Sequence, residues 1–264
     1  MQAFDFASRT TKGARDYQED ASAFWPTKET LSDADAAAAD GSRLVAVLAD
    51  GMGGHTAGAL ASRMVCESFI ESYAGFDGSR AERLLNSLGS ANAALAAKVE
   101  ANPVLSGMGS TLVAAVLSDE GVEWVSVGDS PLLLFRRGEI ALLNEDHSLA
   151  PELDRLAKIG RITAEQAKSD PRRHMLRSAV TGEELDLVDV SRRPLVLEEG
   201  DYVILASDGV HTLETPEIQR IVSAYAADGA EAVAGALIRA VEAMRDPHQD
   251  NTTIIAVRPI PAKK

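Results

Sequence analysis

The feature that most constrains the fold of this chain is a series of apolar segments joined by very short linkers. Between residues 111 and 143 the linkers consist of turn-forming residues, such as SDEG at 118–121 and RRGE at 136–139. Linkers of this length connect antiparallel neighbours, because a crossover between parallel strands needs roughly a dozen residues or more. The alternation of strands and helices that builds a doubly wound sheet is absent. The sequence therefore predicts antiparallel sheets built from hairpins.

Apolar or alternating patterns predict ten strands. They cover residues 4–8, 21–25, 44–49, 111–117, 122–127, 132–135, 140–143, 185–190, 202–206 and 253–257. Apolar residues at helical spacing predict helices over 60–73, 84–95 and 233–244, and a more polar helical insertion over 149–168. We therefore expect an α+β fold in which two sheets pack face to face with helix pairs outside. The Ala- and Asp-rich stretch 26–43 is expected to form an exposed excursion between two strands.

Charge and composition exclude several classes of function. The chain of 264 residues carries 40 Asp and Glu against 26 Lys and Arg, and its net charge of −14 repels nucleic acid and anionic membranes. No apolar stretch approaches the roughly 18 residues of a membrane span, and the first residues lack the pattern of a secretion signal. A single cysteine, Cys66, excludes a disulfide within the chain. We therefore expect a cytoplasmic protein without nucleic-acid or membrane partners.

A glycine-rich segment, LADGMGGHTAG at 48–58, allows two interpretations. It could cradle the phosphates of a nucleotide, or it could form a tight turn that holds Asp50 against a metal ion. A phosphate-binding loop needs Lys and then Ser or Thr after its last glycine, whereas His55 and Thr56 follow Gly54. Asp50 ends an apolar strand, where a buried carboxylate is costly unless it is paired or binds a cation. The sequence favours the metal-binding turn.

The same pattern, an acidic residue at the end of an apolar segment, recurs in the chain. Asp129 and Asp208 follow strands, Asp250 precedes the last strand, and Glu19 and Asp20 stand at the start of another. One such residue is typical of a turn or a cap, but several that converge would repel one another unless a cation neutralised them. They are oxygen ligands without His or Cys partners at metal-binding spacing, which indicates Mg²⁺ or Mn²⁺ over Zn²⁺.

Taken in order, these segments resemble the PP2C-type family of metal-dependent protein phosphatases in its compact bacterial form. The matching motifs are RDYQED, DGMGGHTAG, GSTLVAAVL, VGDS, EDHSLAPEL, LEEGDYVILASDGV and DNTTIIAV, which run from residue 15 to residue 257. The resemblance implies a four-layer αββα sandwich of two antiparallel β-sheets flanked by helix pairs. It also implies that residues 1–264 form a single catalytic domain in which residues 149–180 form a small flap.

The resemblance also implies a set of metal ligands. Asp50 would bridge two tightly bound ions, Mn²⁺ or Mg²⁺. The carbonyl of Gly51 and the side chain of Glu19 would complete the ligands of one ion. Asp208 and Asp250 would hold the other ion.

Other residues take further roles by the same resemblance. Asp20 belongs to the metal site and would orient metal-bound water. Arg15 would bind the substrate phosphate through its planar guanidinium, so Arg15 and Asp50 are the expected catalytic residues. Asp129 would join Asp208 at a third, weaker metal site.

The chain departs from common patterns of the family at four places: Met52, Pro131, Thr212 and the run 174–182. Met52 stands where animal members carry a His that is regarded as a general acid, so no protein acid is assigned. Thr212 stands where many members place a further Asp at the third metal site. A different phosphatase chemistry is excluded at Cys66, because a cysteine phosphatase needs Arg six residues later and position 72 is Ser72.

The function implied by the resemblance is that of a protein serine/threonine phosphatase. It would hydrolyse phosphoserine and phosphothreonine by direct attack of a metal-bridging hydroxide. Its partners would be phosphorylated protein substrates of a Ser/Thr kinase, and we expect a monomer. Two alternatives stay open at this point: a catalytically inactive, phosphoprotein-binding or scaffold member of the same fold, and a hydrolase of small phosphate esters with the same site.

Overall fold

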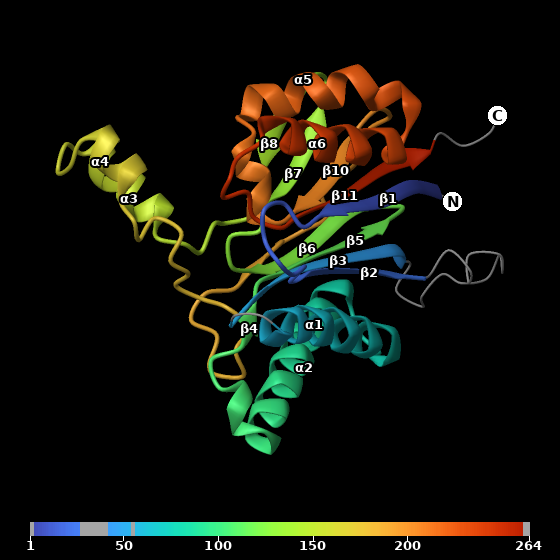
Figure 1. Cartoon of the computed structure of the whole chain (residues 1–264). Helices are drawn as coiled ribbons and strands as arrows, with labels where there is room; N and C mark the ends of the chain where they lie inside the picture. Colours follow the sequence, from blue (N-terminus) through green and yellow to red (C-terminus); the bar gives the residue numbers. More distant parts are fainter. Residues whose placement is uncertain (1–2, 27–41, 54–55, 261–264) are drawn as a thin grey trace.

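The structure is a computed structural model that describes residues 3–26, 42–53 and 56–260. Its strands form two antiparallel sheets that pack face to face, and helices cover both outer sides (Figure 1). The expected four-layer α+β sandwich is thereby confirmed. The excursion expected at 26–43 lies almost entirely outside the described residues.

Each sheet has one continuous order of strands. The first sheet contains, in spatial order, β1 (Ala3–Thr11), β11 (Thr252–Ile260), β10 (Tyr202–Ala206), β7 (Leu132–Arg136) and β8 (Glu139–Leu142). The second contains β2 (Asp20–Trp25), β3 (Ser42–Met52), β5 (Leu112–Ser118), β6 (Gly121–Val127) and β9 (Asp189–Val190), with β4 (Gly109–Ser110) beside β3. Neighbouring strands run antiparallel in both sheets, as the short linkers predict.

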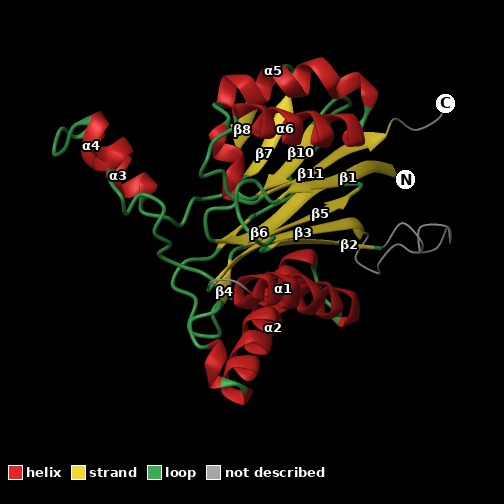
Figure 2. Cartoon of the chain, in the orientation of Figure 1, coloured by secondary structure: helices red, strands yellow, loops and turns green. Residues whose placement is uncertain are grey.

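Two pairs of helices cover the outer faces of the sheets (Figure 2). The pair on the β2–β3 sheet is α1 (Thr56–Gly75) and α2 (Arg80–Ala101), and the pair on the β1–β11 sheet is α5 (Thr215–Tyr225) and α6 (Ala230–Met244). The periodicity of the sequence does not reveal α5, because only Ile218, Ile221 and Val222 of its 11 residues are buried. Of the helices in the described ranges, none is long and apolar enough to span a bilayer.

Three clusters of buried apolar side chains separate the four layers. The strand β3 contributes side chains to two of these clusters. Val45 and Val47 pack against α1 and α2, whereas Leu44 and Leu48 face the opposite sheet. Successive side chains of a strand point to opposite faces, so a shift of one residue would exchange these two sets. Burial of both faces therefore fixes the register that places the strand ends at the site.

The insertion predicted at 149–168 forms two short helices, α3 (Ala150–Lys158) and α4 (Ala164–Ser169), which project from the sandwich (Figure 1). Gly160 lies between them with φ = +73°. The strand predicted at 185–190 is shorter in the structure, where only Asp189–Val190 pair with β6. The reason is that the main chain of Leu187 is hydrogen-bonded to the Ser178 hydroxyl and not to a strand.

The strand ends that carry the predicted acidic residues meet at one edge of the sandwich. Asp20 begins β2 and lies directly opposite Asp50 of β3 in the pairing register. In the first sheet, Asp208 follows β10 closely, and Asp250 precedes β11. These two strands are antiparallel neighbours. Antiparallel pairing thus brings together residues that are far apart in the sequence.

Candidate active site

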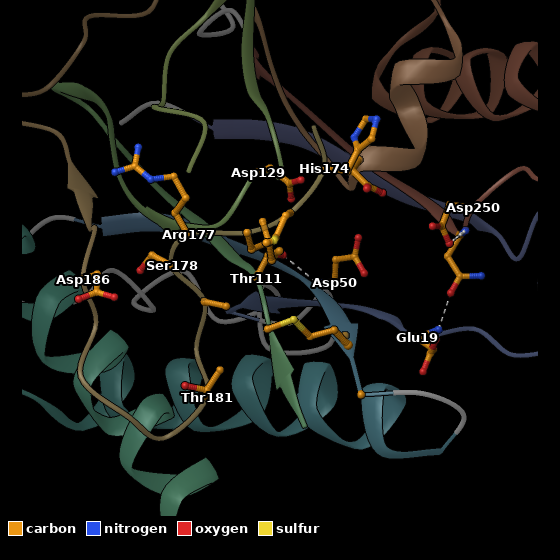
Figure 3. A pocket seen from close by; sticks show the side chains of 18 of the residues that line it. Glu19, Asp50, Thr111, Asp129, His174, Arg177, Ser178, Thr181, Asp186 and Asp250 are labelled. Atoms are coloured by element: carbon orange, nitrogen blue, oxygen red, sulfur yellow. Dashed lines mark hydrogen bonds between the residues drawn. The ribbon is translucent and has the colours of Figure 1, made fainter. Parts of the chain in front are cut away.

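A pocket with a volume of about 680 Å³ opens at this edge (Figure 3). Its lining includes most of the predicted site residues: Arg15, Glu19, Asp50, Gly51, Asp129, Asp208 and Asp250. Asp20 is not part of the lining, although its carboxylate is close enough to Asp50 to raise the pKa of that residue. In Figure 3, Glu19 and Asp250 lie on one side of the pocket, and Arg177 and Asp186 lie on the other.

The ends of β2 and β3 are fixed by backbone hydrogen bonds. The Asp50 N–H donates to the Thr111 hydroxyl at 3.0 Å, and the Asp50 carbonyl accepts from the Thr111 N–H at 2.8 Å. The Gly51 N–H donates to the Glu19 carbonyl at 3.1 Å. These bonds connect the main chains of Glu19, Asp50 and Gly51 at the edge of the sheet.

Two glycines at this edge are required by close packing. A Cβ atom on Gly51 would lie 2.0 Å from the carbonyl oxygen of Gly58, in the first turn of α1. A Cβ atom on Gly58 would lie 2.3 Å from Oε1 of Glu19. Gly51 itself does not have a positive φ. The glycine-rich segment thus lets the start of α1 approach the strand ends that carry Glu19 and Asp50.

Asp208 and Asp250 reach the pocket from the central strands of the first sheet. Asp208 begins the 3-10 helix η3 (Asp208–Thr212), which follows β10. Asp250 precedes β11, and its Oδ2 forms an ion pair with Nη2 of Arg15. The guanidinium of Arg15 therefore lies at the pocket beside the carboxylates.

Burial raises the pKa of four of these acidic residues. Desolvation is the largest cause in each case, and it raises the pKa of Asp20 to about 6 and that of Asp129 to about 7. The pKa of Asp50 is also raised, by desolvation and by the charges of Asp20 and Asp208. Repulsion from Asp250 adds to desolvation in raising the pKa of Asp208. Such a cluster of ionised groups would be stabilised by a nearby cation.

The donor atoms fit a hard divalent cation. The pocket offers carboxylate and carbonyl oxygens, and the buried atoms Asp20 Oδ1 and Asp208 Oδ1 have no hydrogen-bond partner within the described part of the chain. In that same part, no three His, Cys, Asp or Glu side chains are drawn together into a closed metal-binding cluster. The acidic residues of the pocket line one common space. Oxygen ligands of this kind suit Mg²⁺ or Mn²⁺.

Thr212 does not lie where the sequence places it. Its hydroxyl donates to Oε1 of Gln249 at 2.7 Å, and Thr212 is not among the residues that line the pocket. The reason is that the 3-10 turn after Asp208 directs the hydroxyl toward the buried Gln249. The expectation that Thr212 stands at the third metal site is therefore not supported by the geometry.

Sequence reasoning missed several residues of the site. Thr111, His174 and Arg177 line the pocket, although the sequence analysis assigns a role to none of them (Figure 3). Gln249 and Asn251 are buried on both sides of Asp250. The only feature of the sequence that could have indicated Gln249 and Asn251 is that they flank Asp250 just before a strand.

Comparison with known proteins identifies the family. The sequence profile described as protein phosphatase 2C matches residues 27–249. The chain belongs to this family. Among protein phosphatase 2C relatives, the serine/threonine protein phosphatase PstP of Mycobacterium tuberculosis is 38% identical over 175 residues, which cover 64% of this chain and 32% of PstP. The serine/threonine phosphatase stp of Listeria monocytogenes is 33% identical over 180 residues, which cover 66% of this chain and 69% of stp.

Solved structures of the protein phosphatase 2C family share the fold. The crystal structure of PstP from M. tuberculosis has a TM-score of 0.76 at 29% identity and covers 97% of this chain and 98% of that chain. The catalytic domain of PstP in complex with two manganese ions has a TM-score of 0.76 at 27% identity and covers 98% and 100%. The structural match thus covers the whole of the PstP catalytic domain, whereas the sequence alignment covers about a third of the full PstP chain. The family expected from the motifs is confirmed.

Proposed function

We propose that the chain is a metal-dependent protein serine/threonine phosphatase. The observation that carries the proposal is the convergence of acidic residues from several strand ends on one open pocket beside Arg15. Membership of the protein phosphatase 2C family supports this reaction, and so do the activities named for PstP and stp. The presence of all the expected acidic residues speaks against an inactive scaffold.

We assign two metal sites to the pocket. Glu19, Asp50 and the Gly51 carbonyl would hold one ion, and Asp50, Asp208 and Asp250 would hold the other. The structure of the PstP catalytic domain with two manganese ions supports Mn²⁺, and Mg²⁺ suits the same oxygen ligands. When bound, a pair of such ions lowers the pKa of a water molecule and stabilises the negative charge of the reacting phosphate.

Asp20 and Arg15 act beside these ligands. Asp20 lies outside the lining of the pocket, and its Oδ2 accepts a hydrogen bond from the Ser207 hydroxyl at 2.8 Å. We therefore assign Asp20 to the orientation of water in the pocket and not to direct binding of an ion. Arg15 binds the phosphate, because its side chain is half-exposed at the pocket and its planar fork of N–H donors matches two phosphate oxygens. A cation here also favours entry of a dianion into a protein of net charge −14.

A third, weaker metal site is proposed at Asp129 and Asp208, which both line the pocket. The number of charged ligands is one of the main determinants of affinity for hard cations, so two carboxylates bind less tightly than three. Thr212 adds no ligand, since its hydroxyl is bonded to Gln249.

The organisation of the chain completes the proposal. Residues 1–264 would form a single catalytic domain, with 149–180 as a flap whose final residues, including His174 and Arg177, line the pocket. The partners would be phosphorylated proteins, and the protein would act as a monomer. A buried, unpaired Cys66 is compatible with a reducing compartment such as the cytoplasm.

Hydrolysis of a phosphothreonine peptide, measured with Mn²⁺ and with a chelator, tests the proposed function. We expect turnover with Mn²⁺ and none after chelation. A matched measurement on a nucleotide separates the protein phosphatase from a hydrolase of small phosphate esters, which would prefer the nucleotide. Peptide binding without turnover in Mn²⁺ would instead favour the inactive, scaffold alternative.

A further inference from the structure

The tripeptide Gln249–Asp250–Asn251 combines one pocket residue with two buried amides. The side chain of Asp250 is 38% exposed and lines the pocket, whereas Gln249 and Asn251 are only 5% and 3% exposed. Burying a side-chain amide is costly unless its donors and acceptor are all satisfied. The partners of the two amides therefore indicate what each one holds in place.

The amide of Asn251 binds the segment that carries Arg15 and Glu19. Its Oδ1 accepts from the Glu19 N–H at 2.7 Å, and its Nδ2 donates to the carbonyls of Lys12 at 2.9 Å and Tyr17 at 3.0 Å. These bonds close the loop between β1 and β2 against the start of β11. The loop contains Arg15, so one side chain relates the phosphate-binding residue and Glu19 to Asp250.

The amide of Gln249 binds the segment that carries Asp208. Its Nε2 donates to the carbonyl of Gly209 at 3.1 Å, and its Oε1 accepts from the Thr212 hydroxyl at 2.7 Å. Nε2 also lies 3.1 Å from the carbonyl of Asp250. Gln249 thus joins the 3-10 helix that begins at Asp208 to the main chain of Asp250.

Two glycines, Gly13 and Gly209, allow their segments to pack closely against the main chain of this tripeptide. Gly13 has φ = +58°, and a Cβ atom there would lie 2.5 Å from the carbonyl oxygen of Asp250. A Cβ atom on Gly209 would lie 2.2 Å from the carbonyl oxygen of Asn251. Side chains at either position would push apart the segments that the two amides hold together.

We infer that Gln249 and Asn251 are positioning residues with separate tasks, an inference that rests on the proposed function. Asn251 sets Glu19 and Arg15 relative to Asp250, and Gln249 sets Asp208 relative to Asp250. Each task needs a group that donates and accepts at once, which a side-chain amide does and a carboxylate or an apolar side chain does not. Partners that orient metal ligands typically change metal affinity or activity by about 10- to 100-fold when they are removed.

The two tasks give different signatures in the uncharged, similarly shaped variants Gln249→Met and Asn251→Leu. Both should raise the Kd for Mn²⁺ by about 10- to 100-fold, since each releases a segment that carries metal ligands. Only Asn251→Leu should also raise the KM for a phosphothreonine peptide at saturating Mn²⁺, because the Asn251 side chain is bonded to the loop of Arg15. Gln249 contacts this loop through its main-chain carbonyl, which accepts from the Ala14 N–H at 2.9 Å and is kept in Gln249→Met. The milder Thr212→Val, which removes one bond to Gln249, should change the Kd in the same direction as Gln249→Met but less.

A matched control is available at the opposite end of β10 from Asp208. Asp201 is 1% exposed, and its Oδ2 accepts from the Glu198 N–H at 2.6 Å. Asp201→Asn should lower the melting temperature without changing the Kd for Mn²⁺ or the KM.

The experiment is calorimetric titration with Mn²⁺, peptide kinetics and the melting temperature of the metal-free protein for each variant. The inference is overturned if Gln249→Met and Asn251→Leu behave like Asp201→Asn, losing stability but keeping the Kd and the KM. Identical signatures in both variants would overturn the division of tasks. If either variant fails to fold, the smaller Gln249→Ala and Asn251→Ala together with Thr212→Val supply the same comparison. A wild type that binds Mn²⁺ without turning over peptide would refute the proposed function alone, because the Kd still tests the two amides.

Discussion

Arg15 is the pocket residue whose proposed role can be separated most simply from metal binding. It contacts Asp250, but it carries a positive charge and cannot itself be a metal ligand. We expect Arg15→Ala to raise the KM for a phosphothreonine peptide and to weaken inhibition by free phosphate. Arg15→Lys should restore only part of the loss, because a point charge cannot replace two parallel N–H donors. An unchanged KM in Arg15→Ala would move phosphate binding to another residue.

The raised pKa values predict that metal binding depends on pH. Burial and the charge of Asp208 raise the pKa of Asp129 to about 7, so Asp129 is largely protonated at pH 6 and largely ionised at pH 8. A cation has to displace that proton, and its affinity should therefore fall as the pH falls from 8 to 6. Calorimetry in two buffers of different ionisation enthalpy measures the protons released. Asp129→Asn should release fewer protons on binding Mn²⁺ than the wild type. Equal proton release by the two proteins would contradict the assignment of Asp129 as a metal ligand.

At the scale of residues, the acidic groups were predictable and their supports were not. Asp50, Asp208 and Asp250 each adjoin an apolar strand, where a charge stands out in one sequence. Asn251 is a support because of its bonds to Lys12 and Tyr17, residues more than two hundred positions away. Only the fold reveals such a contact.

At the scale of elements, the approach of α1 to β2 and β3 can be tested with a pair of glycines. Ala is favoured over Gly in a helix by about 0.5–1 kcal/mol. At Gly58, however, the new Cβ would lie 2.3 Å from Oε1 of Glu19, which must then move. We expect Gly58→Ala to weaken Mn²⁺ binding while the metal-free protein keeps its stability.

The control for this prediction is Gly89 of α2. Its Cβ would meet no atom within 4 Å, so Gly89→Ala should raise the free energy of unfolding by about 0.5–1 kcal/mol and leave Mn²⁺ affinity unchanged. Calorimetric titration and thermal unfolding of both variants check the comparison. Equal Mn²⁺ affinity in Gly58→Ala and Gly89→Ala would show that the contact with Glu19 has no effect on the site.

Most elements could be predicted because their patterns are local. The hairpins of β5, β6, β7 and β8 follow from turn residues between apolar runs. The helix α5 was not predicted, because its three buried residues give little periodicity in the sequence. The strand predicted at 185–190 was mostly wrong, since Ser178 binds the main chain of Leu187 in place of a neighbouring strand.

At the scale of the whole molecule, the sandwich brings together acidic side chains that would otherwise repel one another. The chain has a net charge of −14, and several of its acidic residues line one pocket. The sheets position these groups through registers that are fixed by apolar side chains on both faces. We therefore propose that these carboxylates hold metal ions that assist the hydrolysis of the phosphoester.

The most direct test of this claim is the kcat of Asp208→Asn on a phosphothreonine peptide at saturating Mn²⁺. This change keeps the shape of the side chain and removes a ligand charge. Since removal of groups that merely orient metal ligands costs about 10- to 100-fold, loss of a ligand should lower kcat by at least about 100-fold. The melting temperature of the metal-free variant should show that it is folded. A folded Asp208→Asn protein with a kcat near that of the wild type would contradict the account.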